Sequence, residues 1–513
     1  MARRGMSAGQ KIITTLRERR QIEEDLRKMP DSRSEVEFRR RAQRIASLGS
    51  QVIPAIVGSL DRADARLLAA MGAVATYLDH DEISLALRQA VLQQGHTDQG
   101  RVGAMTILER FLGEEPDEKL LSSLSDPEAV ALSSLEEVLA HAESNPAILA
   151  EYVQGADRQE PDIVLAVIRT LLDAGDRRTV ELLRLMAQDV RDEIAAEALQ
   201  GLGGLNLAEA AAALQTLIPV VAADLRPLAE RALRKLQFSG VPIRPLPSPE
   251  PGWAALISPV DGLGRQNVWF MRGSRSAGHV RFLNVLLNDQ AGAVEAVGHS
   301  HVPAEILPPQ RPPGYVHDIA LPGGPEIMLM VEASFDVGRR LVLDALVHNR
   351  ETQIPVAAPL RLLSPWLWDV GGADALPPRR LPRLTAEDGV LIAGSGRLLE
   401  HPAFATWTVH SEAVLQAGEE ALHQPGWDLE VQAKRLAAEL LAEPLALEVL
   451  SRRLEAMSEW LLLAGEEDQA RLALVAAQSL AGGAPGQAQD HPLLQALARR
   501  DLQWAASSLE QSI

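Results

Sequence analysis

Two histidines one residue apart, His299 and His301, have the only ligand-like spacing in the chain. They end a segment that is expected to be a strand, and a strand places both side chains on one face. Two imidazoles on one face are half of a zinc site. The remaining ligands would have to come from His279, His317, Asp318 or Glu295. Because no third ligand follows from the spacing, we expect a polar strand end and assign no metal-binding residue.

Other residue types that catalyse reactions occur outside any recognisable motif. Four serines lack a Gly-x-Ser-x-Gly nucleophile elbow, namely Ser258, Ser300, Ser334 and Ser395. Gly394-Ser395-Gly396 lacks the third glycine of a dinucleotide loop, and no Gly-Lys-Ser/Thr occurs. The paired acids Glu419-Glu420 and Glu466-Glu467 belong to expected helix surfaces or turns, where solvation explains them. We therefore assign no catalytic or cofactor-binding residue, and we expect no cofactor.

The tryptophans are concentrated in the second half of the chain. All eight lie beyond residue 250: Trp253, Trp269, Trp366, Trp368, Trp407, Trp427, Trp460 and Trp504. Trp366 and Trp368 are the best pair for stacking on a base or another flat ligand. Such a site should also contain a basic groove, whereas acids dominate the chain. We therefore expect these two rings to pack between domains.

Composition excludes several classes of protein. The chain has 513 residues, which corresponds to about three domains. The absence of cysteine excludes thiol nucleophiles, thiolate metal sites, iron–sulfur clusters and disulfides. The net charge of -19 and pI of about 5.2 are the reverse of the basic character that a duplex-DNA reader shows. Nucleic acid is therefore an unlikely partner on sequence grounds.

The N-terminal region carries no targeting signal. Its apolar run, Ile12-Ile13, is much shorter than the roughly 7–15 residues of a secretory h-region. No uncharged apolar run approaches the ~18 residues of a membrane span, so we expect a cytoplasmic protein without a membrane partner. The first 50 residues have 13 Lys and Arg against 7 Asp and Glu. The cluster Arg39-Arg40-Arg41 with Arg44 is either a contact for an acidic partner or, as we expect, a solvated helix face.

A repeat runs through the first half of the chain. Six segments open with an acid and continue with apolar residues at helical spacing, at intervals of 34, 28, 34, 29 and 35 residues: Asp64, Asp98, Asp126, Glu160, Asp189 and Asp224. We expect each acid to cap its helix, because a carboxylate accepts the unpaired N–H groups there. Each segment has a small residue for close helix contact: Ala69, Ala104, Ala131, Ala166, Ala195 and Ala229. A bulky residue follows about one turn later: Val74, Leu108, Leu135, Leu171, Leu199 and Leu233.

Second helices are expected between these segments, over residues 82–93, 117–124, 178–188 and 207–221. Helix pairs repeating every 30-odd residues stack into an α-solenoid, because one pair cannot bury its apolar face alone. The pattern Asp-x-Arg-x-x-x-Ala-x-x-x-Leu near 189–199 and 224–233 resembles the HEAT repeat, as does 41–60. The resemblance to this armadillo-like family covers about residues 35–240. The alternative is a plain helical bundle with accidental periodicity.

The middle of the chain changes in character after the Pro-rich stretch 239–253. Two hairpins are expected, at 253–260 with 266–273 and at 279–288 with 293–299, forming a four-stranded antiparallel meander. We further expect a Pro-rich crossing at 303–314, a helix at 332–349, an extended stretch at 354–368 and a linker at 376–383. Helices are predicted near 402–423, 428–442, 445–464, 467–481 and 491–508.

Taken together, these patterns predict a mainly α protein with a small α+β module. The predicted parts are a basic N-terminal helix at 1–34, a HEAT-like solenoid at 35–240, an α+β module at 250–375 and a C-terminal helical bundle at 385–513. The resemblance implies little about function, since HEAT-like families include scaffolds, adaptors, lyases and glycosylases. We expect a non-enzymatic scaffold or adaptor that binds a protein partner through the solenoid surface. The alternative is an enzyme or small-ligand-binding protein centred on the α+β module, such as a HEAT-like lyase.

Overall fold

A computed structural model describes residues 19–32, 35–92, 95–114, 138–142, 144–275, 278–320, 327–408, 427–440, 444–482 and 490–510, together with residues 135, 414, 416 and 417. The chain forms two compact units, Met1–Glu137 and Val138–Ile513. It is mainly helical and contains one six-stranded antiparallel sheet, which confirms the coarse fold class. The predicted solenoid range of 35–240 includes parts of both units. None of the described helices combines the length and apolar character needed to cross a bilayer.

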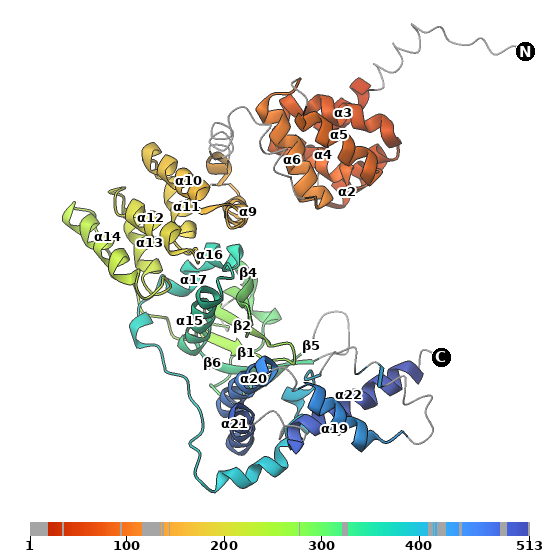
Figure 1. Ribbon diagram of the computed structural model, residues 1–513. Coiled ribbons are helices and arrows are strands. Elements are labelled where there is room, and N and C mark those ends of the chain that lie inside the picture. Colours follow the sequence, from red (N-terminus) through yellow and green to blue (C-terminus); the bar gives the residue numbers. More distant parts are fainter. Residues whose placement is uncertain are drawn as a thin grey trace, which may run out of the picture. The chain divides into compact units, whose positions relative to one another are not determined.

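The first unit is helical throughout its described part (Figure 1). Its α-helices are α2 (Glu35–Ala46), α3 (Ile53–Ser59), α4 (Ala65–Ala75), α5 (His80–Leu92) and α6 (Asp98–Leu112). Short 3-10 helices lie at η1 (Met29–Asp31), η2 (Gly49–Val52) and η3 (Leu60–Arg62). One apolar core joins them, and Leu26, Ile56 and Met71 are completely buried in it.

The second unit begins with helices that pack in two layers. They are α9 (Ala147–Ala156), α10 (Pro161–Ala174), α11 (Thr179–Met186), α12 (Asp192–Leu202), α13 (Ala208–Leu217) and α14 (Arg226–Phe238). Helix α10 packs against α12, and α12 against α14. In the other layer, α11 packs against both α9 and α13. Consecutive helices therefore alternate between the two layers.

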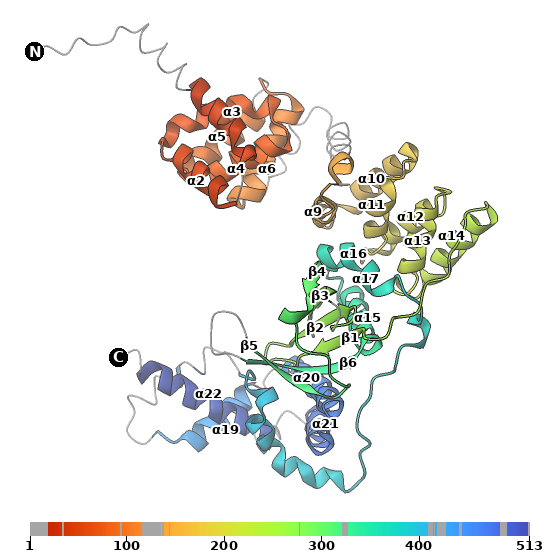
Figure 2. The ribbon, with the colours of Figure 1, turned by 180° about the vertical axis from the view of Figure 1, so that it is seen from behind.

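The sheet of the second unit contains β1 (Ala254–Ile257), β2 (Arg265–Arg272), β3 (His279–Asn288), β4 (Gly292–Pro303), β5 (Val316–Ala320) and β6 (Ile327–Ser334). The strand order is β4-β3-β2-β1-β6-β5. Helix α15 (Phe335–Thr352) covers one face of this sheet (Figures 1 and 2). Gly338 permits the close approach, because a Cβ there would lie 2.6 Å from the ring of Phe270. On the opposite face, Leu256, Met271, Val280 and Met330 form a small apolar cluster.

The remaining elements of the second unit are largely helical. They are η4 (Ala304–Ile306), α16 (Ala358–Leu363), α17 (Pro365–Trp368), η5 (Ala373–Ala375), η6 (Asp388–Glu400), η7 (Pro402–Phe404), α19 (Leu429–Leu440), α20 (Pro444–Leu463), α21 (Glu467–Gly482) and α22 (Pro492–Glu510). Helix α20 attaches to the end of the sheet, where the Trp460 indole donates a hydrogen bond of 2.8 Å to the Ile257 carbonyl. The Trp407 indole donates a similar bond to the Val260 carbonyl.

The predicted helix caps are mostly wrong. Asp64 caps α4 as expected, and its carboxylate accepts the Leu67 N–H at 2.8 Å. Helix α6 is instead capped by Thr97, one residue before the predicted acid. Glu160 occupies the cap position of α10 without a side-chain hydrogen bond. Helices α12 and α14 begin two or three residues after Asp189 and Asp224, and Asp126 lies outside the described residues.

The small residues of the repeat are buried at only some of the predicted positions. Ala104, Ala195 and Ala229 are buried. Ala69 is exposed because the register of α4 turns Ala70 inward instead, and Ala166 is half-buried. Ala131 lies outside the described residues. The bulky positions are more consistent, since all are buried except the half-buried Leu233: Val74, Leu108, Leu135, Leu171 and Leu199.

The second helices of the repeat also appear in the structure. Helices α5, α11 and α13 correspond to the predictions at 82–93, 178–188 and 207–221, whereas 117–124 lies outside the described residues. Helices α19 to α22 confirm the last four predicted C-terminal helices. The prediction at 402–423 falls mostly outside the described residues, and its first part is the 3-10 helix η7.

The four predicted strands are confirmed, but the sheet has two more. Strands β5 and β6 follow the Pro-rich crossing, and residues 332–334 belong to β6 instead of the predicted helix, which begins only at Phe335. The extended stretch predicted at 354–368 is wrong, because helices α16 and α17 occupy most of it. Each of these helices has proline in its first turn, where the missing N–H costs nothing.

Candidate functional site

The two histidines of the predicted pair do not share a face. In the register of β3 and β4, Phe282 pairs with His299 and Val280 with Val302, so the ladder shifts between these pairs. The extra residue reverses the alternation, and His299 and Val302 lie on the same face. His301 therefore turns to the other face, where its ring centroid lies 6.4 Å from that of His279. The expectation that the strand would present both imidazoles together is wrong for this reason.

The other candidate metal ligands do not gather around this strand. His317 lies on β5, which is separated from β4 by four strands in the sheet order, and Asp318 follows it. Glu295 is opposite Leu286 on the exposed part of β4. Within the described part of the chain, no three His, Asp or Glu side chains come together as a metal site would require.

None of the four serines considered in the sequence analysis lies in a nucleophile motif in the structure, and each is characterised by its contacts or its burial. The Ser258 hydroxyl contacts the Pro259 carbonyl and accepts the Asn267 N–H at 2.9 Å. Ser334 caps α15 by accepting the Val337 N–H. Ser300 is exposed beside His301, at 3.0 Å from its Nδ1. Ser395 is completely buried within η6, and so is not part of a phosphate-binding loop between a strand and a helix.

The paired acids and the tryptophan pair also have ordinary roles. Glu466 lies 2.8 Å from the His401 ring, and Glu467 pairs with Arg471 on the first turn of α21. Glu419 and Glu420 lie outside the described residues. The Trp366 ring packs against Gly298 of the sheet, while Trp368 is completely buried. The two rings pack inside the second unit, between its sheet and helices.

The arginine cluster of the first unit lies on α2. Arg41 pairs with Glu37 at 2.6 Å and donates to the Lys28 carbonyl. Arg40 and Arg44 are exposed one turn apart. The exposure of Arg40 and Arg44 agrees with the expected solvated helix face.

A buried ionic triad is the main feature of the sheet that sequence reasoning missed. Glu332 on β6 contacts the Arg275 guanidinium, and its other oxygen lies 2.9 Å from His317 Nε2. The side chains are only 1% exposed for Arg275, 2% for Glu332 and 6% for His317. Arg275 also donates to the Pro308 carbonyl, which fastens the Pro-rich crossing to the sheet. A single acid within the apolar run of β6 was the signal for this cluster.

A second buried ionic network joins the repeat helices to the sheet module. Arg361 on α16 is completely buried and lies 2.9 Å from Asp157, which follows α9. Arg184 on α11 donates to the Arg361 carbonyl at 2.8 Å and to the Ser364 hydroxyl at 2.9 Å. Burial raises the pKa of Asp157, although the Arg361 charge opposes that rise. We call these four residues the seam.

The seam uses one of the two layers of repeat helices. Helix α16 packs against α9 and α11, and α17 packs against α13. The figures show the same arrangement, with α16 and α17 beside the repeat helices and with α10, α12 and α14 farther from the sheet (Figures 1 and 2). The layer of α9, α11 and α13 is therefore occupied by the chain itself. The layer of α10, α12 and α14 has no such cover among the described residues.

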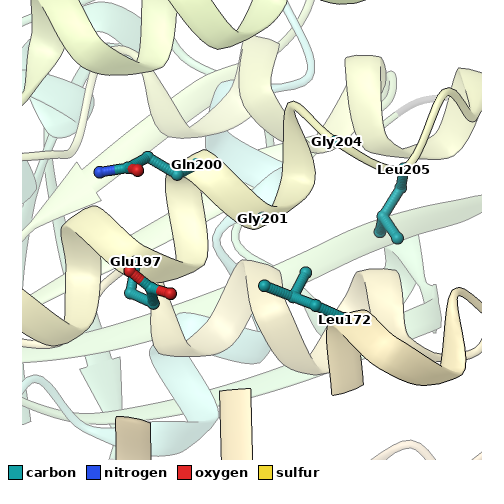
Figure 3. Close-up of a pocket in the computed structure, with 6 residues that line it drawn as sticks. All are labelled: Leu172, Glu197, Gln200, Gly201, Gly204 and Leu205. Carbon is teal, nitrogen blue, oxygen red and sulfur yellow. The ribbon is translucent and has the colours of Figure 1, made fainter. Parts of the chain in front are cut away.

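A pocket of about 310 Å³ opens on this uncovered layer, between α10 and α12. Its lining residues are Leu172, Glu197, Gln200, Gly201, Gly204 and Leu205 (Figure 3). Gly201 brings the two helices together, because a Cβ there would lie 2.5 Å from Leu172 Cδ2. Leu172 and Leu205 contribute apolar side chains to the lining, while Glu197 and Gln200 contribute polar groups. We call this pocket the α10–α12 groove.

The groove has the chemistry of a binding surface. A single carboxylate and an amide among aliphatic and glycine residues provide shape and charge, without a nucleophile and base in contact. The volume is at the lower end of the range for small-ligand pockets, and it suits one side chain of a partner. No family model, curated protein or solved structure matches the chain.

Proposed function

We propose that the chain is a non-enzymatic interaction protein, in which the stacked helices form a HEAT-like α-solenoid that binds a protein partner. The binding surface is the layer of α10, α12 and α14. One observation carries the proposal: the opposite layer packs against α16 and α17, whereas among the described residues this layer has no such cover and contains the α10–α12 groove. Contacts between one layer and the rest of the chain hold the solenoid in place. The other layer is then a preformed surface, which lowers the entropic cost of binding a partner.

The alternative, an enzyme or ligand-binding protein centred on the sheet module, has less support. Its best candidates for acid–base chemistry are Glu332 and His317, which nearly lack contact with solvent. A general acid or base must come within hydrogen-bond reach of its substrate. The two carboxylate oxygens of Glu332 instead contact Arg275 and His317. These contacts favour a structural role.

An affinity experiment in extract of the native host tests the proposal. The intact protein is compared with a Gln200→Trp variant, which places a large side chain at the rim of the groove. The matched control is Gln310→Trp, since Gln310 is an exposed glutamine on the Pro-rich crossing. We expect a partner that is retained by the wild type and the control and lost from Gln200→Trp. Equal retention by all three proteins would contradict the proposed surface.

A further inference from the structure

The rim of the α10–α12 groove has an excess of negative charge. Glu197 lines the groove, and Glu193 lies one turn earlier on the same face of α12. Neither carboxylate has an ion-pair partner in the described part of the chain. Like charges four residues apart destabilise a helix by about 0.2–0.5 kcal/mol, although the positive start of α12 and the charge of Arg191 favour Glu193.

Other charged residues lie near the groove. Asp192 extends the acidic rim toward the start of α12, and burial together with Asp224 and Glu193 raises its pKa. Arg169, one turn before Leu172 on α10, is exposed and forms no ion pair among the described residues. Arg350 opposes the rise in the pKa of Asp192, and Arg191, which pairs with Asp189, lies within electrostatic reach of Glu193. With Asp189 and Asp224 included, five acids and three arginines lie in this region, so acids are in excess.

We propose that the α10–α12 groove binds a partner segment with one bulky aliphatic side chain and with Lys or Arg about one helical turn away. The aliphatic side chain occupies the groove between Leu172 and Leu205, and the cations pair with Glu193 and Glu197. The inference rests on the proposed function and names the chemistry of its partner. Charge complementarity selects the cations, because an acidic segment of the same shape would meet like charge.

Peptide selection tests this inference on the intact protein. The probe is a display library of random peptides, and the affinities of the selected peptides are then measured by calorimetry. We expect peptides that combine Leu, Ile or Met with at least two Lys or Arg residues. The Glu193→Lys/Glu197→Lys variant should lower their affinity tenfold or more, and raising the salt concentration should weaken wild-type binding.

A matched charge reversal controls for the overall change in charge. Glu448→Lys alters an exposed acid on α20, far along the chain from the groove, and should leave the affinity within twofold of the wild type. Hydrogen exchange then locates each bound peptide. Peptides that protect α10 and α12 but lack basic residues would overturn the inferred partner chemistry while leaving the proposed function intact. A selection whose peptides leave α10, α12 and α14 unprotected would contradict both.

Discussion

The two layers of helices in the second unit both bury apolar side chains but have different environments. Helices α9, α11 and α13 pack against α16 and α17, whereas α10, α12 and α14 lack such cover in the described structure. Buried apolar residues occur in both layers, as Leu182 and Leu183 on α11 and Ile194 and Leu199 on α12 show. The difference comes from charged residues outside the repeat pattern, chiefly Arg184, Asp157 and Arg361. Apolar residues therefore hold the two layers of helices together, and individual charged residues determine which layer packs against α16 and α17.

The largest effect is expected from removing the cation of the seam. Arg361→Ala leaves Asp157 buried without its partner and removes the donor to the Val356 carbonyl. Breaking a buried ion pair by losing one partner costs about 3–5 kcal/mol. Denaturant unfolding should show this loss. Arg231→Ala, on the uncovered helix α14, is the matched control and should change stability by less than about 0.5 kcal/mol. Equal effects of the two substitutions would remove the distinction between the layers.

A smaller effect is expected from overfilling the space between the layers. Ala195 on α12 is 2% exposed, so Ala195→Trp forces neighbouring side chains out of place. Overpacking of this kind costs at or above about 1–3 kcal/mol. The exposed Ala212 on α13 provides the control, since Ala212→Trp adds the same ring at the surface. An unfolding midpoint of Ala195→Trp equal to that of the wild type would show that the register of α12 is wrong.

The seam should also contribute a pH dependence to stability through Asp157. Burial raises the pKa of Asp157 in the folded protein, so the folded state holds this proton more tightly than the unfolded state. The resulting stability is complete below the ordinary pKa of an aspartate and is lost as the pH rises through the raised value. Asp157→Asn should remove this decline, which unfolding measured at several pH values will show. An unchanged pH profile in Asp157→Asn would place the origin of the dependence elsewhere.

The smallest expected effect concerns the rim of the groove. Glu197→Gln relieves the repulsion between Glu193 and Glu197 without removing an acid from the first turn of α12, and it should stabilise the fold by about 0.2–0.5 kcal/mol. Thermal unfolding at low salt provides the measurement, and added salt should reduce the gain by screening. A loss of stability would instead mean that Glu197 forms a favourable contact, and it would weaken the argument for an unoccupied acidic rim.

Part of this fold follows directly from the sequence. The helices of the repeat were predictable because their apolar positions recur at helical spacing, and β1 to β4 because Asp261-Gly262 and Asp289 mark the turns between them. Helices α16 and α17 replace the expected extended stretch, because Pro359 and Pro365 each lie in a first helical turn, where proline is compatible with a helix. The predicted caps were wrong because Thr97 caps α6 and no side chain caps α12, where acids were expected.

The candidate site was much less predictable than the fold. The α10–α12 groove depends on how Leu172 and Gly201 meet across two repeats, and this contact has no local signature in the sequence. The separation of His299 and His301 depends on one register shift between β3 and β4. Buried charges gave a usable signal, since Glu332 and Arg361 each interrupt an apolar run. Their partners were not deducible, because Asp157 is 204 residues from Arg361.

Thiol labelling tests the difference between the two layers most directly, because the chain has no cysteine of its own. Ser364→Cys places a nearly isosteric thiol in the seam, where Ser364 is 3% exposed, and Gln200→Cys places one at the rim of the groove. We predict that maleimide modifies Gln200→Cys at the rate of an exposed thiol and Ser364→Cys far more slowly. Adding Arg361→Ala to Ser364→Cys should raise the labelling rate of that thiol. Equal rates in the two single variants of the folded protein would contradict the assignment of one layer to the chain and the other to a partner.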